Sequence, residues 1–142
     1  MIGYGKLGGI VLGYGSDLDL VFIHALEEQS ETDGKKSISG AEFAIRVAQK
    51  FMSLMTTQTL DGRVYEIDTR LRPSGEAGML VTSLKAYEHY QQKSAWLWEH
   101  QALVRARSIA GDTDLCQQFE QIRCQILTQV RDEDEVRQEV LK

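Results

Sequence analysis

Two aspartates that lie one residue apart, Asp17 and Asp19, have the clearest chemical potential in this sequence. They stand at the start of an apolar, β-prone run, Leu18–His24, and side chains along a strand alternate between its two faces. Both carboxylates are therefore expected on one face, with their Cα atoms roughly 6.5–7 Å apart. Mg²⁺, which binds one or two carboxylates together with substrate phosphates, suits such a pair.

A third carboxylate, Asp68, lies in a run of alternating apolar and charged residues that predicts a strand over 63–72. The alternation places Tyr65, Ile67, Thr69 and Leu71 on one face and Glu66, Asp68, Arg70 and Arg72 on the other. If this strand pairs with that of Asp17 and Asp19 in a mixed sheet, the three aspartates can hold two metal ions and leave one carboxylate to accept a proton. A nucleotidyl-transfer site has this layout, in which the third aspartate activates a hydroxyl for in-line attack on an α-phosphorus.

Several residues near the aspartates are candidate phosphate ligands. Gly15 and Ser16 form a turn whose backbone N–H groups and hydroxyl can face a phosphate. Lys6 lies in the glycine-rich segment Gly5–Gly9, which lacks the spacing of a dinucleotide fingerprint or a P-loop and is interpreted as a tight turn. Lys6 either binds phosphate there or is simply solvated.

Arg70 and Arg72 share the predicted face of Asp68, and their guanidinium groups could bind phosphate oxygens in a bidentate manner. The structural alternative is an exposed face of cross-strand ion pairs. Likewise, an isolated Asp-x-Asp often caps a turn. Trp96 and Trp98 are expected to fill a core rather than stack on a base, and His100 to be a hydrogen-bonded structural histidine.

The elements that must position these residues alternate along the chain. Met1–Gly5 is expected to be the tail of a strand, and 27–39 a polar loop. Ser39, followed by Glu42, is typical of a capping box and predicts a helix to about Thr57. A turn is then expected at Asp61–Gly62.

The second half of the chain is predicted to be mainly helical. Pro73 ends the strand that carries Asp68, and Ser83 is a plausible N-cap for a helix through about Gln92. Another helix is predicted over 95–109, ending before Gly111. From Asp114 onward, one amphipathic helical face is formed by Leu115, Phe119, Ile122, Ile126 and Val130.

The composition excludes several classes of protein. With 142 residues, 42% of them apolar, the chain can bury one modest core. A net charge of -5 argues against a surface that coats nucleic acid, and no apolar run approaches the ~20 residues of a membrane span. Cys116 and Cys124 lie in a helical stretch and no signal peptide is seen, which indicates a reduced, cytoplasmic protein. The three histidines lack partners at zinc-ligand spacing.

Four segments together resemble one family, the bifunctional glutamine synthetase adenylyltransferase/adenylyl-removing enzymes. They are Gly3–Gly9, Gly13–Phe22, Tyr65–Gly75 and Trp98–Arg107, and the resemblance covers nearly the whole chain. Among the two related domains of this family, the motifs resemble the C-terminal, adenylylating one. Between Gly9 and Leu12 the family usually has a charged or polar residue and then glutamate, where this chain has Ile10-Val11.

The resemblance implies an α+β nucleotidyltransferase fold, with a short mixed β-sheet, packed helices and a C-terminal helical extension. It divides the chain into an N-terminally truncated catalytic domain, 1–111, and a helix leading to a helical region, 112–142. Asp17 and Asp19 match the metal-binding pair and Asp68 the third carboxylate, with Mg²⁺ or Mn²⁺ as cofactor.

The activity implied is AMP transfer from ATP to a tyrosine of glutamine synthetase, with a PII-type signal protein as regulator of the longer enzyme. Two alternatives stay open: a phosphorolytic deadenylylating domain, and a catalytically silent module that binds nucleotide or a regulator.

Overall fold

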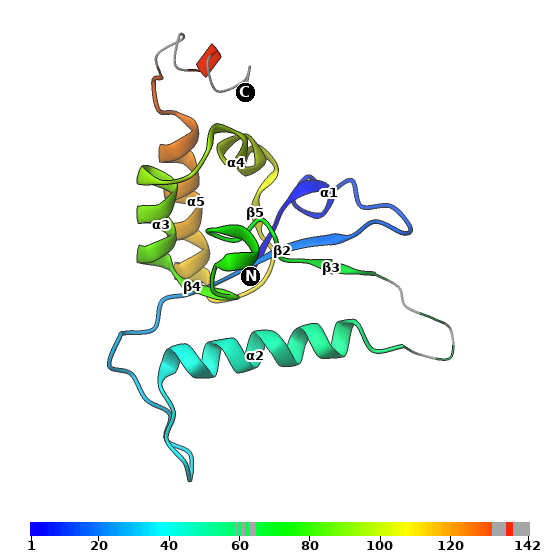
Figure 1. The fold of residues 1–142 in the computed structure, drawn as a ribbon, viewed down its shortest axis with the longest axis vertical. Coiled ribbons are helices and arrows are strands. Elements are labelled where there is room, and N and C mark those ends of the chain that lie inside the picture. The colour runs from blue at the N-terminus through cyan, green and yellow to red at the C-terminus, as the bar shows by residue number, and fades with distance from the viewer. Residues whose placement is uncertain (59, 61, 63–64, 132–135, 138–142) are drawn as a thin grey trace.

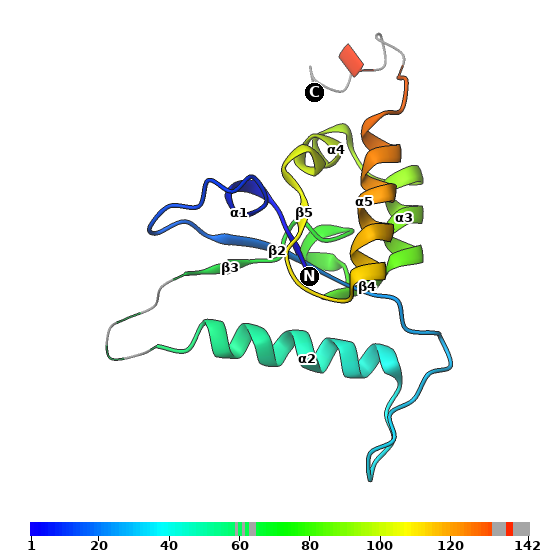
Figure 2. The ribbon, with the colours of Figure 1, turned by 180° about the vertical axis from the view of Figure 1, so that it is seen from behind.

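In the computed structural model of the protein, a small mixed sheet lies between α2 (Gly40–Met55) on one face and α3 (Leu84–Lys93) and α5 (Thr113–Leu127) on the other (Figure 1). The structure describes residues 1–58, 60, 62, 65–131, 136 and 137. The remaining elements are β1 (Ile2–Gly3), α1 (Gly5–Gly8), β2 (Leu18–His24), β3 (Ile67–Asp68), η1 (Gly75–Ala77), β4 (Val81–Ser83), α4 (Leu97–Ala102), η2 (Leu103–Arg105) and β5 (Arg107–Ser108). The view from behind shows the same two helical layers (Figure 2).

Strand β2 is the centre of the sheet. One of its edges pairs with β1 in antiparallel orientation, and β1 pairs in turn with β5. Its other edge pairs in parallel with β3 over its first residues and with β4 over its last. The mixed sheet and the β2 strand are thus confirmed as predicted.

Both faces of β2 are covered because its side chains alternate between two apolar clusters. Val21 and Ile23 pack in the cluster that contains α3 and α5, whereas Leu18, Leu20 and Phe22 pack in the cluster that contains α2. Asp19 has the same parity as Val21, so it faces the α3 and α5 side. This alternation decides on which face the candidate site lies.

Serine caps begin α2 and α3 as predicted. The Ser39 hydroxyl accepts a hydrogen bond from the backbone N–H of Glu42 at 3.2 Å, and the Ser83 hydroxyl accepts one from Ala86 at 3.2 Å. The Glu42 carboxylate pairs with Arg46 on the helix surface. Helix α2 ends at Met55, close to the predicted Thr57.

The prediction of one strand over 63–72 is confirmed only at Ile67–Asp68, which form β3, and is wrong for the residues after Asp68. The Arg72 guanidinium donates hydrogen bonds to the backbone carbonyls of Thr69 at 2.8 Å, Glu76 at 3.1 Å and Gly78 at 3.3 Å, which curls the chain into a loop. Leu71 consequently packs against the α3 and α5 cluster instead of joining Ile67 in the α2 cluster. Residues 61, 63 and 64, at the start of the predicted strand and in the preceding turn, lie outside the described part.

The prediction of one helix over 95–109 is confirmed in its first half and wrong in its second half. Helix α4 ends at Ala102, a 3₁₀ turn follows, and the chain then pairs with β1 as β5. Trp96 and Trp98 are 61% and 55% exposed, so the expectation that they fill a core is wrong as well. His100 does form the predicted structural hydrogen bonds, with the Gln91 carbonyl at 2.8 Å and with Arg131 at 2.7 Å.

Helix α5 begins after an N-cap at Asp112, which accepts a hydrogen bond from Leu115, and ends at Leu127. Its Phe119, Ile122 and Ile126 side chains are buried in the α3 and α5 cluster as the amphipathic pattern predicted. Val130 lies beyond the helix and is fully exposed, contrary to the pattern. A domain boundary at residue 112 stays a prediction.

The thiols of Cys116 and Cys124 are free. Among the described residues, no helix has the length and apolarity needed to cross a membrane.

A buried pair of tyrosine hydroxyl groups joins the residue that follows β1 to α3. The hydroxyl oxygens of Tyr4 and Tyr87 lie 2.6 Å apart, both side chains are buried, and burial raises the pKa of each above its ordinary value. We expect Tyr87→Phe to lower the free energy of unfolding by about 1–2 kcal/mol, since it leaves the Tyr4 hydroxyl without this partner. Urea denaturation of the single and double phenylalanine variants measures this coupling, and strict additivity of the two single substitutions would contradict it.

Candidate functional site

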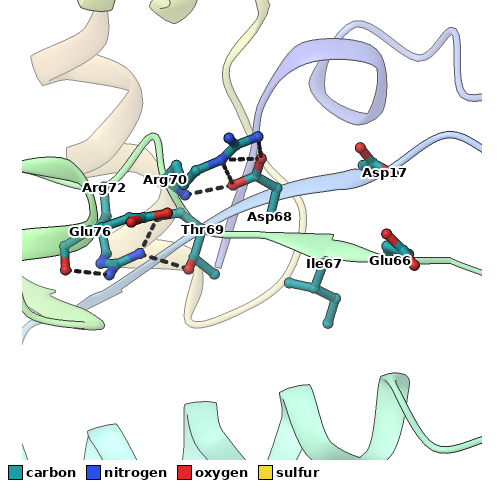
Figure 3. A pocket seen from close by; sticks show the side chains of 8 residues that line it. All are labelled: Asp17, Glu66, Ile67, Asp68, Thr69, Arg70, Arg72 and Glu76. Carbon is teal, nitrogen blue, oxygen red and sulfur yellow. Dashed lines mark hydrogen bonds and ion pairs between the residues drawn. The ribbon is translucent and has the colours of Figure 1, made fainter.

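The parallel pairing of β2 with β3 brings two of the candidate carboxylates together. In this register Asp19 lies opposite Asp68 and Leu18 opposite Ile67, so both aspartates leave the sheet on the same face. Figure 3 shows Asp17 and Asp68 on the side of the strands away from α2, while Ile67 points toward α2. The sequence prediction that Asp68 lies on a strand beside the Asp17 and Asp19 pair is therefore confirmed.

An open pocket of about 570 Å³ lies over this face. Its lining residues are Asp17, Glu66, Ile67, Asp68, Thr69, Arg70, Arg72 and Glu76. The lining combines four acidic side chains with two arginines, so it can accept a ligand that carries both phosphate groups and a cation.

The three aspartates are close enough to influence one another electrostatically. The pKa of Asp19 is raised above its ordinary value, first by burial and then by the negative charges of Asp68 and Asp17. The positive charges of Arg70 and Lys6 act in the opposite direction. A divalent cation placed among these carboxylates would relieve the repulsion, so the chemistry of the donor set fits Mg²⁺ or Mn²⁺.

Asp68 is paired with Arg70. The Arg70 Nε donates to the Asp68 carboxylate oxygens at 2.8 and 3.1 Å, a terminal guanidinium nitrogen donates to Oδ2, and the Arg70 backbone N–H donates to Oδ1 at 2.8 Å. These hydrogen bonds are the main reason that the pKa of Asp68 lies below its ordinary value. Within the described residues, no three His, Cys, Asp or Glu side chains are arranged to hold one metal ion. The role of Asp17, Asp19 and Asp68 as metal ligands therefore stays a prediction.

The turn before the aspartate pair brings Ser16 and Lys6 together. The Ser16 hydroxyl is buried, accepts a hydrogen bond from the Gly13 backbone N–H at 3.3 Å, and lies 3.5 Å from the Lys6 ammonium. Gly15 has a φ of 73°, which favours glycine at that position. The predicted phosphate-side residues therefore cluster at the edge of the acidic pair, and their role in phosphate binding stays a prediction.

Arg72 is placed differently from Arg70. Its guanidinium is directed at the loop after β3, where it also donates to the Thr69 hydroxyl at 2.8 Å (Figure 3). These bonds count against a direct contact between Arg72 and phosphate. Its contribution is to shape the loop that carries Arg70.

The glycine-rich segment is a short helix, α1, instead of the predicted turn, and it contacts Asp19 closely. Gly5 has a φ of 52°, and a Cβ atom at this position would lie 2.4 Å from the Asp19 Oδ2 atom. The Tyr4 backbone N–H donates to the Asp19 carbonyl at 2.9 Å. Sequence reasoning missed this contact, although the density of glycine in Gly3–Gly9 is a signal for a close approach of backbone to a functional group.

The departure at Ile10-Val11 lies at the end of α1. Ile10 has a φ of 58°, which is unusual for a β-branched residue, and its side chain is exposed. Neither Ile10 nor Val11 is among the residues that line the pocket.

The raised pKa of Asp19 predicts a specific dependence of stability on pH. The stability associated with a protonated Asp19 is fully present below the ordinary pKa of 3.8 and is lost as the pH rises through the raised pKa of the folded state. We therefore expect Asp19→Asn to be more stable than the parent near neutral pH without divalent cations, and equally stable at about pH 3. Thermal denaturation in EDTA across this range measures the difference, and an unchanged or lower melting temperature near neutral pH would contradict the prediction.

The fold and the site define a mixed α/β protein with an acidic pocket beside its central strand and a glycine-rich helix packed against one of the carboxylates. The chain belongs to the glutamate-ammonia ligase adenylyltransferase family, whose model matches residues 1–122. This confirms the resemblance inferred from the four sequence segments.

Several curated relatives carry the name bifunctional glutamine synthetase adenylyltransferase/adenylyl-removing enzyme. The relative from Acinetobacter baylyi is 82% identical over all 142 residues, which are 15% of its own length. Relatives from Thioalkalivibrio sulfidiphilus and Pseudomonas aeruginosa are each 55% identical over 99% of the chain. The chain spans only 14–15% of the length of these relatives.

Proposed function

We propose that this chain is a nucleotidyltransferase unit that transfers AMP from ATP to a tyrosine hydroxyl of glutamine synthetase and releases pyrophosphate. One observation carries the proposal: the parallel register of β2 and β3, which brings Asp68 beside Asp19 on the face where Asp17 also lies. Membership of the adenylyltransferase family supports the donor and the acceptor.

The residues of the pocket divide the chemistry among them. Asp17 and Asp19 hold the divalent cation, which supplies neutralisation of the charge on the triphosphate. Lys6 and Ser16, next to the acidic pair, orient phosphate oxygens. A bond forms between the tyrosine oxygen and the α-phosphorus as the bond from that phosphorus to pyrophosphate breaks, and Asp68 accepts the proton of the tyrosine hydroxyl.

Arg70 can bind either the Asp68 carboxylate or a phosphate group. Its side chain is 70% exposed, so its guanidinium can exchange the Asp68 carboxylate for a phosphate oxygen of the bound nucleotide. Asp68 is then free to act as a base. Arg70 and Asp68 thus have roles in the same step, Arg70 in binding phosphate and Asp68 in accepting the proton.

The direct experiment incubates the chain with ATP labelled at the α-phosphate, Mg²⁺ or Mn²⁺, and unmodified glutamine synthetase. Label is expected on glutamine synthetase, with the longer Acinetobacter baylyi relative as a positive control for the acceptor preparation. The reverse assay supplies adenylylated glutamine synthetase and phosphate. Formation of ADP without forward transfer would assign the chain to adenylyl removal instead.

A catalytically silent module is the remaining alternative. Calorimetry with ATP in the presence and absence of Mg²⁺ separates it from an enzyme, because the proposed site needs the cation to hold the triphosphate. Binding that is independent of metal, without transfer in either direction, would favour the silent module. Control by a PII-type signal protein stays a prediction of the family resemblance.

A further inference from the structure

We infer that Arg107 is a positioning residue that keeps the Asp19 carboxylate in place by binding the carbonyl groups at the C-terminal end of α1. The inference rests on the proposed function, in which Asp19 is a metal ligand. Arg107 is not among the residues that line the pocket, and its guanidinium donates hydrogen bonds to carbonyls of α1, so its effect on the site passes through α1.

Arg107 contacts the C-terminal end of α1. Strand β5 pairs with β1 so that Arg107 lies opposite Gly3, and from there its guanidinium donates to the Gly8 carbonyl at 3.2 Å and to the Leu7 carbonyl at 3.4 Å. The last carbonyls of a helix have no partner within that helix and carry partial negative charge. Because α1 has only four residues, it cannot persist through its own hydrogen bonds and needs such external contacts.

Helix α1 also packs closely against its neighbours at Gly8. A Cβ atom at Gly8 would lie 1.8 Å from the Arg105 carbonyl oxygen and 2.5 Å from the Gly3 carbonyl oxygen. Backbone therefore touches backbone at this end of α1. These contacts block a shift of α1 toward β1 or η2. The hydrogen bonds from Arg107 oppose a shift of α1 away from them.

The other end of α1 contacts the acidic pair. Its first residue, Gly5, lies so close to Asp19 that a Cβ atom there would be 2.4 Å from the carboxylate oxygen. Only two residues, Lys6 and Leu7, separate Gly8 from this contact at Gly5, and packed backbone transmits small displacements. If α1 loosens at its C-terminal end, Asp19 gains room to turn, and its orientation toward a cation becomes less defined.

Strand β5, which carries Arg107, is itself anchored to the core. The Ser108 backbone N–H donates to the Glu120 carboxylate of α5 at 3.2 Å, and Glu120 also pairs with Arg123 at 3.3 Å. These contacts hold β5 against α5. The guanidinium thus projects from a fixed strand onto two carbonyls, a geometry that a lysine ammonium reproduces only in part.

The test measures Mn²⁺ affinity directly, by calorimetry, in the 142-residue chain without ATP. We expect Arg107→Met to weaken Mn²⁺ binding about tenfold, the size of effect seen when the partners behind a metal ligand are removed. Arg107→Lys should recover part of this loss. The matched control is Arg46→Met, which removes a guanidinium that pairs with Glu42 on the surface of α2. This variant should leave Mn²⁺ affinity unchanged.

Two further measurements separate positioning from a purely structural role. The concentration of Mn²⁺ that gives half-maximal transfer should rise in both Arg107 variants, while the KM for glutamine synthetase should stay constant. Unfolding curves in EDTA give the folded fraction of each variant, and affinities are expressed per folded molecule. If Arg107→Met does not fold, Arg107→Lys alone must still show weaker Mn²⁺ binding.

Mn²⁺ affinity in the Arg107 variants equal to that of Arg46→Met would overturn the inference and leave the proposed function standing. A parent chain that binds no Mn²⁺ at all would overturn the proposed metal site, and the inference with it. Weaker binding together with a constant KM for the acceptor protein supports both.

Discussion

Replacing Asp17 with asparagine is expected to lower the rate of AMP transfer by about three orders of magnitude, or about 4 kcal/mol of transition-state stabilisation. The substitution keeps one oxygen donor but removes the negative charge that balances the cation. Asp17 is exposed at the pocket, so the loss should come from chemistry and not from packing.

The measurement is single-turnover transfer of labelled AMP to glutamine synthetase at saturating Mg²⁺. Asp33→Asn, in the exposed loop between β2 and α2, is the matched control because it makes the same chemical change away from the pocket, and it should transfer at the parental rate. A rate for Asp17→Asn within a few-fold of the parent would show that this carboxylate is not a metal ligand.

The parts of the fold that could be predicted from the sequence are those set by local interactions. Ser39 and Ser83 identified the starts of α2 and α3 because a serine hydroxyl satisfies a free N–H group within three residues of itself. Strand β2 was predicted from its composition, and the face of Asp19 follows from strand alternation. The candidate carboxylates could therefore be named before their contacts were known.

The parts that could not be predicted depend on partners far away in the chain or on side chains that redirect the backbone. Strand β5 forms by pairing with β1, about one hundred residues earlier, and this overrides the helical pattern that continues past Ala102. Arg72 bends the chain after β3 by bonding carbonyls of its own loop, an effect that alternation of polar and apolar residues does not reveal. The first error hid the contact of Arg107 with α1. The ion pair of Asp68 with Arg70 agrees with the ion-pair alternative for this charged face, except that it forms within one segment and not across two strands.

The extent to which the apolar side chains of α2 are covered is another feature that could not be predicted from the sequence. Phe43 and Val47 are 49% and 52% exposed, whereas Ala48 on the same helix is buried. The helix packs on the sheet along a narrower stripe than its apolar residues occupy, since the angle at which a helix meets its neighbour is a tertiary property. A sequence pattern therefore predicts the element and its inner face, but not the extent of the contact.

Gly8→Ala is expected to lower the free energy of unfolding by about 3 kcal/mol, the upper part of the range for overpacking. Helix propensity alone predicts the opposite sign, because alanine favours a helix over glycine by about 1 kcal/mol. Packing decides against propensity here: the added methyl group would lie 1.8 Å from the Arg105 carbonyl oxygen and 2.5 Å from that of Gly3, and these are backbone atoms that cannot turn aside.

Gly34→Ala is the control for Gly8→Ala, because the nearest atom to a Cβ at that loop position is 4.0 Å away, and it should change stability by less than about 0.5 kcal/mol. Urea denaturation of both variants in EDTA measures the difference free of metal binding. Since α1 must move to admit the methyl group, Gly8→Ala should also weaken Mn²⁺ binding per folded molecule, as the Arg107 variants do. Equal stability of the two alanine variants would show that α1 yields without resistance, and the rigid link between Gly8 and the Asp19 carboxylate would then be wrong.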